Sequence, residues 1–396
     1  MRAYLDNAST TKMSRAAIEA MLPYLDTVYG NPSSLHSMGQ RAKEALEEAR
    51  ERVAACLGAK ASEIYFTSGG SESDNQAILS AAAIGARKGK KRIVTTAFEH
   101  HAVLHTLRKL EKSGYEVVYL PVGREGNIAP SAVCEAINEE TALVTVMAAN
   151  NEIGSVLPIQ EIGVICREKK VIFHTDAVQA VGHIPVDVGR MQVDMLSLSG
   201  HKFHGPKGVG VLYVRKGIPL TNLIEGGAQE GGKRAGTENV AGIIALAAAL
   251  KESTDRLEEN ASKVSSLRDR LIAGLSAIPH SVLNGDPVHR LPGNVHFCFE
   301  GIEGESLLLL LDEYGIEASS GSACTSGSLD PSHVLLAIGH PHEIAHGSLR
   351  LTLSEYTTEE EIDLALEAIP KVVERLRNMS PIWRDKVKGI KPFLLQ

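Results

Sequence analysis

Short apolar runs and amphipathic segments alternate along residues 60–215 in a regular order. Runs rich in β-branched residues and bounded by glycine or polar residues predict strands. They are expected at 64–67, 92–96, 115–120, 142–148, 171–175, 194–198 and 209–214. Helical spacing between the runs predicts helices at about 70–85, 101–113, 131–138 and 158–169. Strands that alternate with helices of this length indicate a mostly parallel sheet covered on both faces.

The rest of the chain follows a different rhythm. Helical spacing is found at 14–25 and 38–57, and a long, bent helix is expected at about 240–275 as a bridge to a second domain. Beyond it, strands are expected near 294–299 and 349–353, and helices at 304–314, 331–338 and 358–377. We therefore predict an α/β protein. Its large domain, 12–258, holds a mostly parallel seven-stranded sheet, and its smaller α+β domain combines 1–11 with 259–396 and carries a mobile cysteine loop at about 319–330.

Composition narrows the class of protein. Of 396 residues, 43% are hydrophobic and 22% are charged, as in ordinary globular proteins. A net charge of -7 argues against nucleic acid as the main partner, because phosphate binding needs a basic face. We expect a cytoplasmic protein without a membrane partner, since neither a signal-peptide pattern nor an apolar run of membrane-spanning length is found. The five cysteines are odd in number, scattered and without a CxxC pair, which predicts no disulfide framework.

Polar residues follow several predicted strands at the point where each strand ends. They are the segments 99–101, 150–152, 176–179 and 201–202, together with the glycine turn at 69–71. Ligands of parallel sheets bind beyond the carboxyl ends of the strands. The clusters therefore predict one shared site at one edge of the sheet.

Lys202 lies in a polar, glycine-bordered turn between two buried strands. A desolvated lysine can lose its proton and form a Schiff base with an aldehyde such as pyridoxal 5′-phosphate (PLP). Asp176, at a strand end, suits the pyridine nitrogen of that cofactor. The glycine turn that opens a helix suits its phosphate. Taken singly, a surface turn and a plain capped helix explain these features as well.

Seven motifs occur in one order along the chain. They are YLDN at 4–7, GNPSS at 30–34, FTSG at 66–69, NNEIG at 150–154, DAVQ at 176–179, SGHK at 199–202 and SSGSACTS at 319–326. With them, the chain resembles the cysteine desulfurases of the NifS/IscS type, which are fold-type I PLP-dependent transferases, over essentially its whole length.

The resemblance implies a role for individual residues. Lys202, His100 and Cys324 would be catalytic, and Arg350, with help from Asn31, would bind the carboxylate of L-cysteine. The residues implied to hold PLP are Gly70, Ser71, His100, Asn151, Asp176, Gln179, Ser199, His201, Lys202 and Thr237. Thr237 would reach the cofactor of the other subunit, which implies a homodimer.

The resemblance implies that Cys324 accepts the sulfur atom of the substrate. It would attack the sulfur of bound L-cysteine, so that L-alanine leaves and a persulfide stays on the protein. An iron–sulfur scaffold protein would accept that sulfur, and Cys324 would transiently bind the nascent cluster as an iron ligand. We expect its thiol to be activated when the loop closes, with the proton passing to a base such as His100.

The chain departs from the expected pattern at three places. Gly70 and Ser71 stand where alanine and threonine are expected, with the hydroxyl kept. At 354–355, a serine–glutamate pair replaces glycine–arginine, which we expect to affect partner docking more than chemistry. His101 has no assigned role.

Other functions remain as alternatives at this point. His101 and His105 are four residues apart on a predicted helix, the spacing of a metal pair. A selenocysteine lyase would share Lys202 and Asp176 but should have a shorter, different loop, and an aminotransferase would need no loop cysteine. A binding-only assembly platform would need neither Lys202 nor Cys324.

Overall fold

The structure is a computed structural model that describes residues 2–321 and 331–395. Its large sheet has seven strands in the order β2-β8-β7-β6-β5-β3-β4. Only β8 is antiparallel to its neighbours, and the other six strands run in one direction. The bounds are β2 (Ile64–Thr67), β3 (Arg92–Thr96), β4 (Glu116–Leu120), β5 (Thr141–Thr145), β6 (Ile172–Asp176), β7 (Met195–Ser199) and β8 (Gly210–Val214). The predicted α/β class and the seven strands are confirmed.

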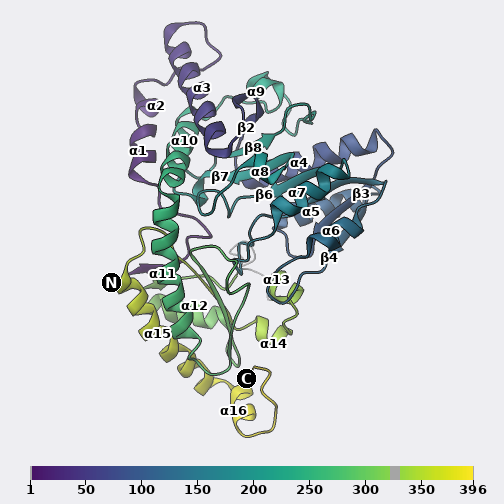
Figure 1. Ribbon diagram of the computed structural model, residues 1–396. Helices are drawn as coiled ribbons and strands as arrows, with labels where there is room; N and C mark the ends of the chain where they lie inside the picture. Colours follow the sequence, from purple (N-terminus) through teal and green to yellow (C-terminus); the bar gives the residue numbers. More distant parts are fainter. Residues whose placement is uncertain (1, 322–330, 396) are drawn as a thin grey trace.

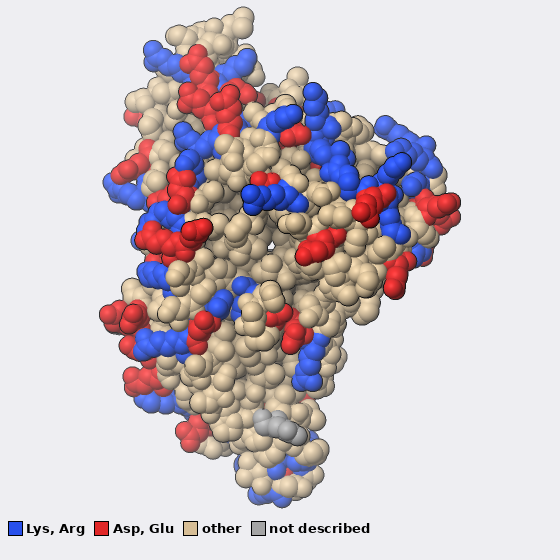
Figure 2. Space-filling model, viewed as in Figure 1, with Lys and Arg blue, Asp and Glu red and all other residues tan. Residues whose placement is uncertain are grey.

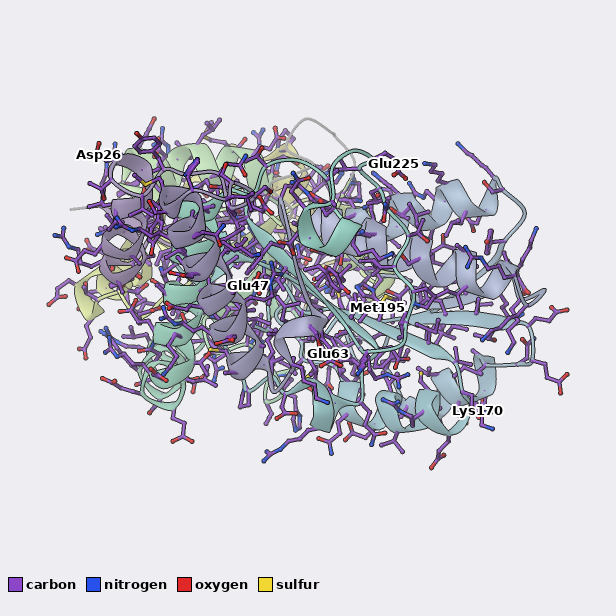
Figure 3. All side chains as sticks on the ribbon, turned by 90° about the horizontal axis from the view of Figure 1, so that it is seen from above. Asp26, Glu47, Glu63, Lys170, Met195 and Glu225 are labelled. Carbon is purple, nitrogen blue, oxygen red and sulfur yellow. The ribbon has the colours of Figure 1, made fainter. Side chains whose placement is uncertain are left out.

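Neighbouring residues of one strand enter different hydrophobic cores, because successive side chains point to opposite faces. Ile93, Leu143 and Met195 belong to the core that includes helices α4 (Gly70–Ala86) and α5 (His101–Glu111). Val94, Val144 and Leu196 belong to the core on the other face, which includes α7 (Ile159–Glu168). Figure 3 shows helices on both sides of the sheet. This double cover explains why the strands read as continuous apolar runs rather than as alternating patterns.

The remaining helices of this part lie around the sheet and along one side of it (Figure 1). They are α1 (Arg15–Met21), α2 (Pro23–Asp26), α3 (Ser37–Leu57), α6 (Pro130–Ala136), α8 (Val188–Met191), α9 (Gln229–Gly232) and α10 (Val240–Asp255). The single helix predicted at 14–25 is two short helices that meet at Pro23, a residue that starts a helix better than it continues one.

A second, smaller sheet has the order β12-β10-β9, with the strands β9 (Ser281–Leu283), β10 (Asn294–Phe299) and β12 (Ser348–Thr352). Near it, β1 (Ala3–Tyr4) pairs in parallel with β11 (Ile316–Glu317). Residues 3, 5 and 264–373 supply the buried members of a separate core. The helices here are α11 (Leu257–Leu275), α12 (Gly304–Glu313), α13 (His333–Ala337), α14 (His342–Ala345), α15 (Glu359–Met379) and α16 (Pro381–Val387). The domain boundaries at 11/12 and 258/259 stay a prediction.

The predicted long helix is bent where expected. Helices α10 and α11 meet at Arg256, whose φ of -108° and ψ of 15° are not helical. In Figure 1 the two helices form a column that runs past both sheets. Over the face shown in Figure 2, lysine and arginine side chains are mixed with aspartate and glutamate. Within the described ranges, we find no helix whose length and apolar character would let it cross a bilayer.

A buried ion pair fixes the glycine-rich segment 226–236. Arg50 of α3 donates from Nη1 and Nη2 to the two carboxylate oxygens of Glu230, each at 2.8 Å. Glu230 also accepts the backbone N–H of Phe66 at 2.9 Å. Its φ of 48° lies in the left-handed region that side chains other than glycine rarely adopt. The pair therefore holds an unfavourable backbone turn against α3 and β2.

We expect Glu230→Gln to lower the free energy of unfolding by about 3 kcal/mol, since it leaves the buried guanidinium of Arg50 without its anion. The matched control is Glu47→Gln, because Glu47 lies 3.5 Å from Arg50 Nε but its side chain is 51% exposed. That variant should change the free energy by less than about 1 kcal/mol. Urea unfolding of both variants measures the difference, and equal losses would contradict this account.

Candidate active site

A cavity of about 210 Å³ lies at the carboxyl edge of the large sheet. Loops that follow β2, β3, β5, β6 and β7 supply most of its wall. Its lining residues are Ala8, Ser9, Gly70, Ser71, Asp74, His100, Met147, Asn151, Asp176, Val178, Gln179, Ser199, His201, Lys202 and Arg350. The structure thus brings the predicted strand-end clusters together, and it adds residues 8–9 and Arg350 from outside the sheet.

Lys202 ends a single helical turn, Gly200–Lys202, that follows β7 directly. Its Nζ donates to the carbonyl oxygens of Ala8 at 2.6 Å and Ser9 at 2.9 Å. The turn itself is tied to the same N-terminal segment, because the hydroxyl of Thr11 donates to the carbonyl of His201 at 2.9 Å. Residues 8–11 therefore form a wall that orients the lysine amine at the cavity.

The glycine turn lies beside the lysine turn because β8 connects them. Gly210 of β8 faces Gly69 so closely that a Cβ at 210 would lie 2.6 Å from the Gly69 Cα. Helix α4 begins at Gly70, and its first residues, Gly70 and Ser71, line the cavity. The N–H groups of a first helical turn have no partner within the helix. A Cβ at Gly70 would lie 2.6 Å from Cγ2 of Val178. Glycine in place of the expected alanine thus makes room for Val178.

Two further groups at the cavity have shifted pKa values. Burial raises the pKa of Asp176 to about 6, although the backbone N–H of Val178 and the charge of Lys202 act in the opposite direction. Burial, with the charges of Lys202, His333 and His105, lowers the pKa of His100 to about 4. His100 is therefore neutral at pH 7. Its Nδ1 accepts the N–H of Ala102 at 3.1 Å, so its proton is on Nε2. This geometry favours His100 as a neutral donor and not as a resting proton acceptor.

Arg350, on β12, reaches the cavity from the smaller sheet and is 2% exposed. Nη1 donates to the carbonyl of Asn151 at 2.9 Å, and Nη2 donates to Asp6 at 3.0 Å and to the hydroxyl of Ser9 at 2.7 Å. Its Nε has no hydrogen-bond partner among the residues that the structure describes. As a buried arginine that lines the cavity, Arg350 is suited to an incoming carboxylate.

Three predicted residues are not part of the cavity as described. Asn31 is exposed, and its side chain accepts the N–H of Ser33 at 2.9 Å within its own turn. Thr237 is exposed on the segment after Gly236. Cys324 lies outside the described residues. The roles of these three residues stay predictions.

The unassigned His101 lies in a cluster of histidine rings. Its centroid is 5.1 Å from that of His105 and 4.7 Å from that of His333. In the described ranges, the one group of three metal-type ligands within 4.8 Å of one another is Asp74, His100 and Asp176. Among the residues that the structure describes, His101 and His105 therefore have no third ligand at that spacing.

The substituted segment 354–355 faces inward. Nε2 of His204 donates to Glu355 at 2.9 Å, and Nδ1 of the same ring lies 2.8 Å from the carbonyl of Lys12. Both ring nitrogens face acceptors, an arrangement that favours the doubly protonated imidazolium. Burial alone would lower its pKa, but the hydrogen bond and charge of Glu355 raise it. Glu355 thus joins the lysine turn to the end of β12. This contact lies inside the protein, whereas the substitution at 354–355 was expected to affect partner docking.

Sequence reasoning missed several residues at this site. Asp6 and Ser9 hold Arg350, although the YLDN motif at 4–7 is a signal for Asp6 only and Ser9 lies outside it. Asp74 lines the cavity one helical turn beyond Gly70. Its sequence context, a polar helix start, gave no sign of this position.

Comparison with known proteins agrees with the geometry. Residues 3–365 match the protein family described as Aminotransferase class-V. A curated relative, "Cysteine desulfurase IscS" of Methanosarcina thermophila, is 54% identical over 379 residues, which are 96% of this chain and 94% of the relative. A solved structure titled "NIFS-LIKE PROTEIN" has a TM-score of 0.89 and 40% identity over 95% of this chain and all of that one. Another, titled "SspA in complex with cysteine", has a TM-score of 0.79 and 36% identity over 90% of this chain and all of that one.

The His204–Glu355 pair predicts a pH-dependent stability. Because the folded pKa of His204 is raised, its contribution is complete below the unfolded value of about 6.5 and is lost as the pH rises through the folded value. Glu355→Gln should therefore lower the thermal midpoint more at pH 6 than at pH 9, with a loss of roughly 1–3 kcal/mol at pH 6. Thermal unfolding of both proteins at the two pH values measures this. An equal loss at pH 6 and pH 9 would show that the ion pair is not the cause.

Proposed function

Because the chain belongs to the class-V aminotransferase family, among the cysteine desulfurases of the IscS/NifS type, we propose that its cavity holds PLP at Lys202 and uses it to desulfurate L-cysteine. The protein is a cysteine desulfurase. One observation carries the proposal for the site: an amine, a buried carboxyl group and a helix N-terminus converge on a single cavity at the carboxyl edge of the sheet.

The residues present fit PLP at three points. The start of α4 at Gly70 and Ser71 supplies backbone N–H groups and the positive end of a 17-residue helix for the phosphate. Ser199 and His201 line the cavity beside it, and burial and the charges of Lys202 and Lys207 lower the pKa of His201 to about 4, so it is neutral. Asp176 supplies the anion for the pyridine nitrogen, and Lys202 supplies the amine.

When bound, PLP supplies an electron sink for the amino acid attached to it. The chain's own residues orient the reactants. His100, which lines the cavity as a neutral imidazole, would cover the ring, and Asn151 and Gln179 would hydrogen-bond on its oxygen side. The amide of Gln179 donates to the carbonyl of Ala8 at 3.0 Å, which fixes its orientation beside Lys202.

Arg350 binds the carboxylate of L-cysteine in this proposal. Its partners Asp6 and Ser9 hold the guanidinium at the cavity, and its Nε is the donor with no partner within the described part of the chain. The structure of SspA, a similar protein, was solved in complex with cysteine, which supports the same substrate here. Asn31 would have to act from a different position than the one described.

Cys324 is the proposed sulfur acceptor. Its thiolate attacks the sulfur of the substrate, the carbon–sulfur bond breaks, and the carbon takes up a proton, so L-cysteine and the thiol become L-alanine and a persulfide. Burial raises the pKa of Cys166 and of Cys298 to about 12, and burial also raises that of Cys56. These three thiols are therefore poor nucleophiles at neutral pH.

We further propose a homodimer in which Thr237 reaches the partner's cofactor, and an iron–sulfur scaffold protein as the persulfide acceptor. The segment that carries Thr237 is linked to the phosphate turn, because Arg234 pairs with Glu72 of α4 at 3.0 Å. A transient iron–sulfur ligand role of Cys324 belongs to the same proposal. These assignments rest on the resemblance to the family.

Cys324→Ser tests the assignment, because a serine hydroxyl is a far weaker nucleophile than a thiolate. The variant should keep the visible absorption of bound PLP, while alanine formation from L-cysteine falls more than about a hundredfold. Cys134→Ser is the matched control and should keep both properties. Alanine is quantified after a single turnover. Full alanine formation by Cys324→Ser would place the acceptor on another cysteine, and a protein that takes up no PLP would contradict the proposed function.

A further inference from the structure

Asp74 lies at the cavity without a role in the reaction as described above. It belongs to the second turn of α4, it is 1% exposed, and it lines the cavity together with Asp176. One carboxylate oxygen of Asp74, one of Asp176 and one ring nitrogen of His100 lie within 4.8 Å of one another. Two buried carboxyl groups therefore lie at the place where the proposed function needs one.

The groups around Asp74 supply little positive charge. His174 of β6 lies 3.6 Å from it, between the hydroxyls of Thr145 at 2.9 Å and Ser197 at 3.0 Å. Burial lowers the pKa of His174 to about 3, so this ring is neutral. Glu99 is another acid whose charge acts on Asp74, and burial raises the pKa of Glu99 to about 8. Lys202 is the cation that acts on Asp176.

Two carboxylates this close, buried together, cannot both be ionised at low cost. Burial, followed by the charge of Asp176, raises the pKa of Asp74 well above its usual value, while a hydrogen bond with Ser197 acts in the opposite direction. The Oδ1 atom of Asp74 has no hydrogen-bond partner within the described part of the chain. A proton on Asp74 would remove one of the two buried negative charges. It would also turn the carboxyl group into a hydrogen-bond donor.

A metal ion is the other way to neutralise such a group. Here His100 uses its Nδ1 lone pair to accept the N–H of Ala102, and its Nε2 carries the proton. That ring would have to change its tautomer or break its helix cap to become a ligand. The geometry therefore favours a shared proton over a cation.

We propose that Asp74 is a positioning residue: as the neutral acid it donates a hydrogen bond to Asp176 and fixes the one carboxylate that faces the pyridine nitrogen. The proposal rests on the proposed binding of PLP in this cavity. With Asp74 neutral, a protonated ring and Asp176 balance each other, whereas two carboxylates would leave an unpaired negative charge in a dry site.

Asparagine and alanine at position 74 separate this role from simple space filling. Asp74→Asn keeps a neutral donor of the same shape, and Asp74→Ala removes the donor. Asp74→Asn should bind PLP within about threefold of the parent, and Asp74→Ala should bind it about tenfold more weakly, as expected for the loss of one buried hydrogen bond to a charged group. Asp176→Asn, which removes the anion itself, should show the largest change in the pH dependence of the visible band. Equilibrium dialysis and absorption spectra between pH 5 and 9 measure both quantities.

The cofactor-free protein provides a second measurement, which does not depend on the proposed function. An acid whose folded pKa is raised loses stability as the pH rises from its unfolded value, about 4, through its folded value. Asp74→Asn should therefore flatten the decline of the thermal midpoint from pH 5 to pH 8. Equal declines in parent and variant would overturn the proposal, as would equal PLP affinities of the asparagine and alanine variants. If the parent protein takes up no PLP while Asp74→Asn still flattens the decline, that result would instead contradict the proposed function alone.

Discussion

The position of the site depends on the common direction of the strands in the large sheet. All strands of that sheet except β8 run the same way, so their carboxyl ends meet at one edge and bring Lys202, Asp176 and His100 to one cavity. The same convergence places several ionisable groups in a dry space, where burial dominates their pKa values. Without a cofactor, these groups have to be neutral or hydrogen-bonded. The imidazoles are neutral, and the Lys202 amine donates to two backbone carbonyl oxygens.

Much of the fold could be predicted from the sequence. The buried strands read as apolar runs because helices cover both faces, and β3 and β10 have the predicted bounds. Most strand ends lie within one residue of the predicted ones, so the residues that follow them could be assigned to one edge of the sheet. The strand predicted to end at 148 is the exception, because β5 ends at Thr145. The short strands β1, β9 and β11 were not found, because two or three residues carry too little pattern.

Contacts between distant segments could not be predicted in the same way. The pairing of Asp6 with Arg350 joins residues 344 positions apart, and that of His204 with Glu355 joins residues 151 apart. Asp74 looked like an ordinary polar residue at a helix start, because nothing in the sequence shows that the first turns of α4 face the end of β6. The substitution at 354–355 is visible in the sequence, but the inward direction of Glu355 depends on the packing of the two sheets.

The most direct test of this account is the position of the cofactor on the chain. The purified protein is treated with borohydride, which fixes an amine-bound PLP irreversibly, and the labelled peptide is identified by mass spectrometry. One labelled residue is expected, Lys202, with no label in Lys202→Ala. A label on another lysine in the unmodified protein would contradict the central claim, which is that the turn after β7 carries the cofactor.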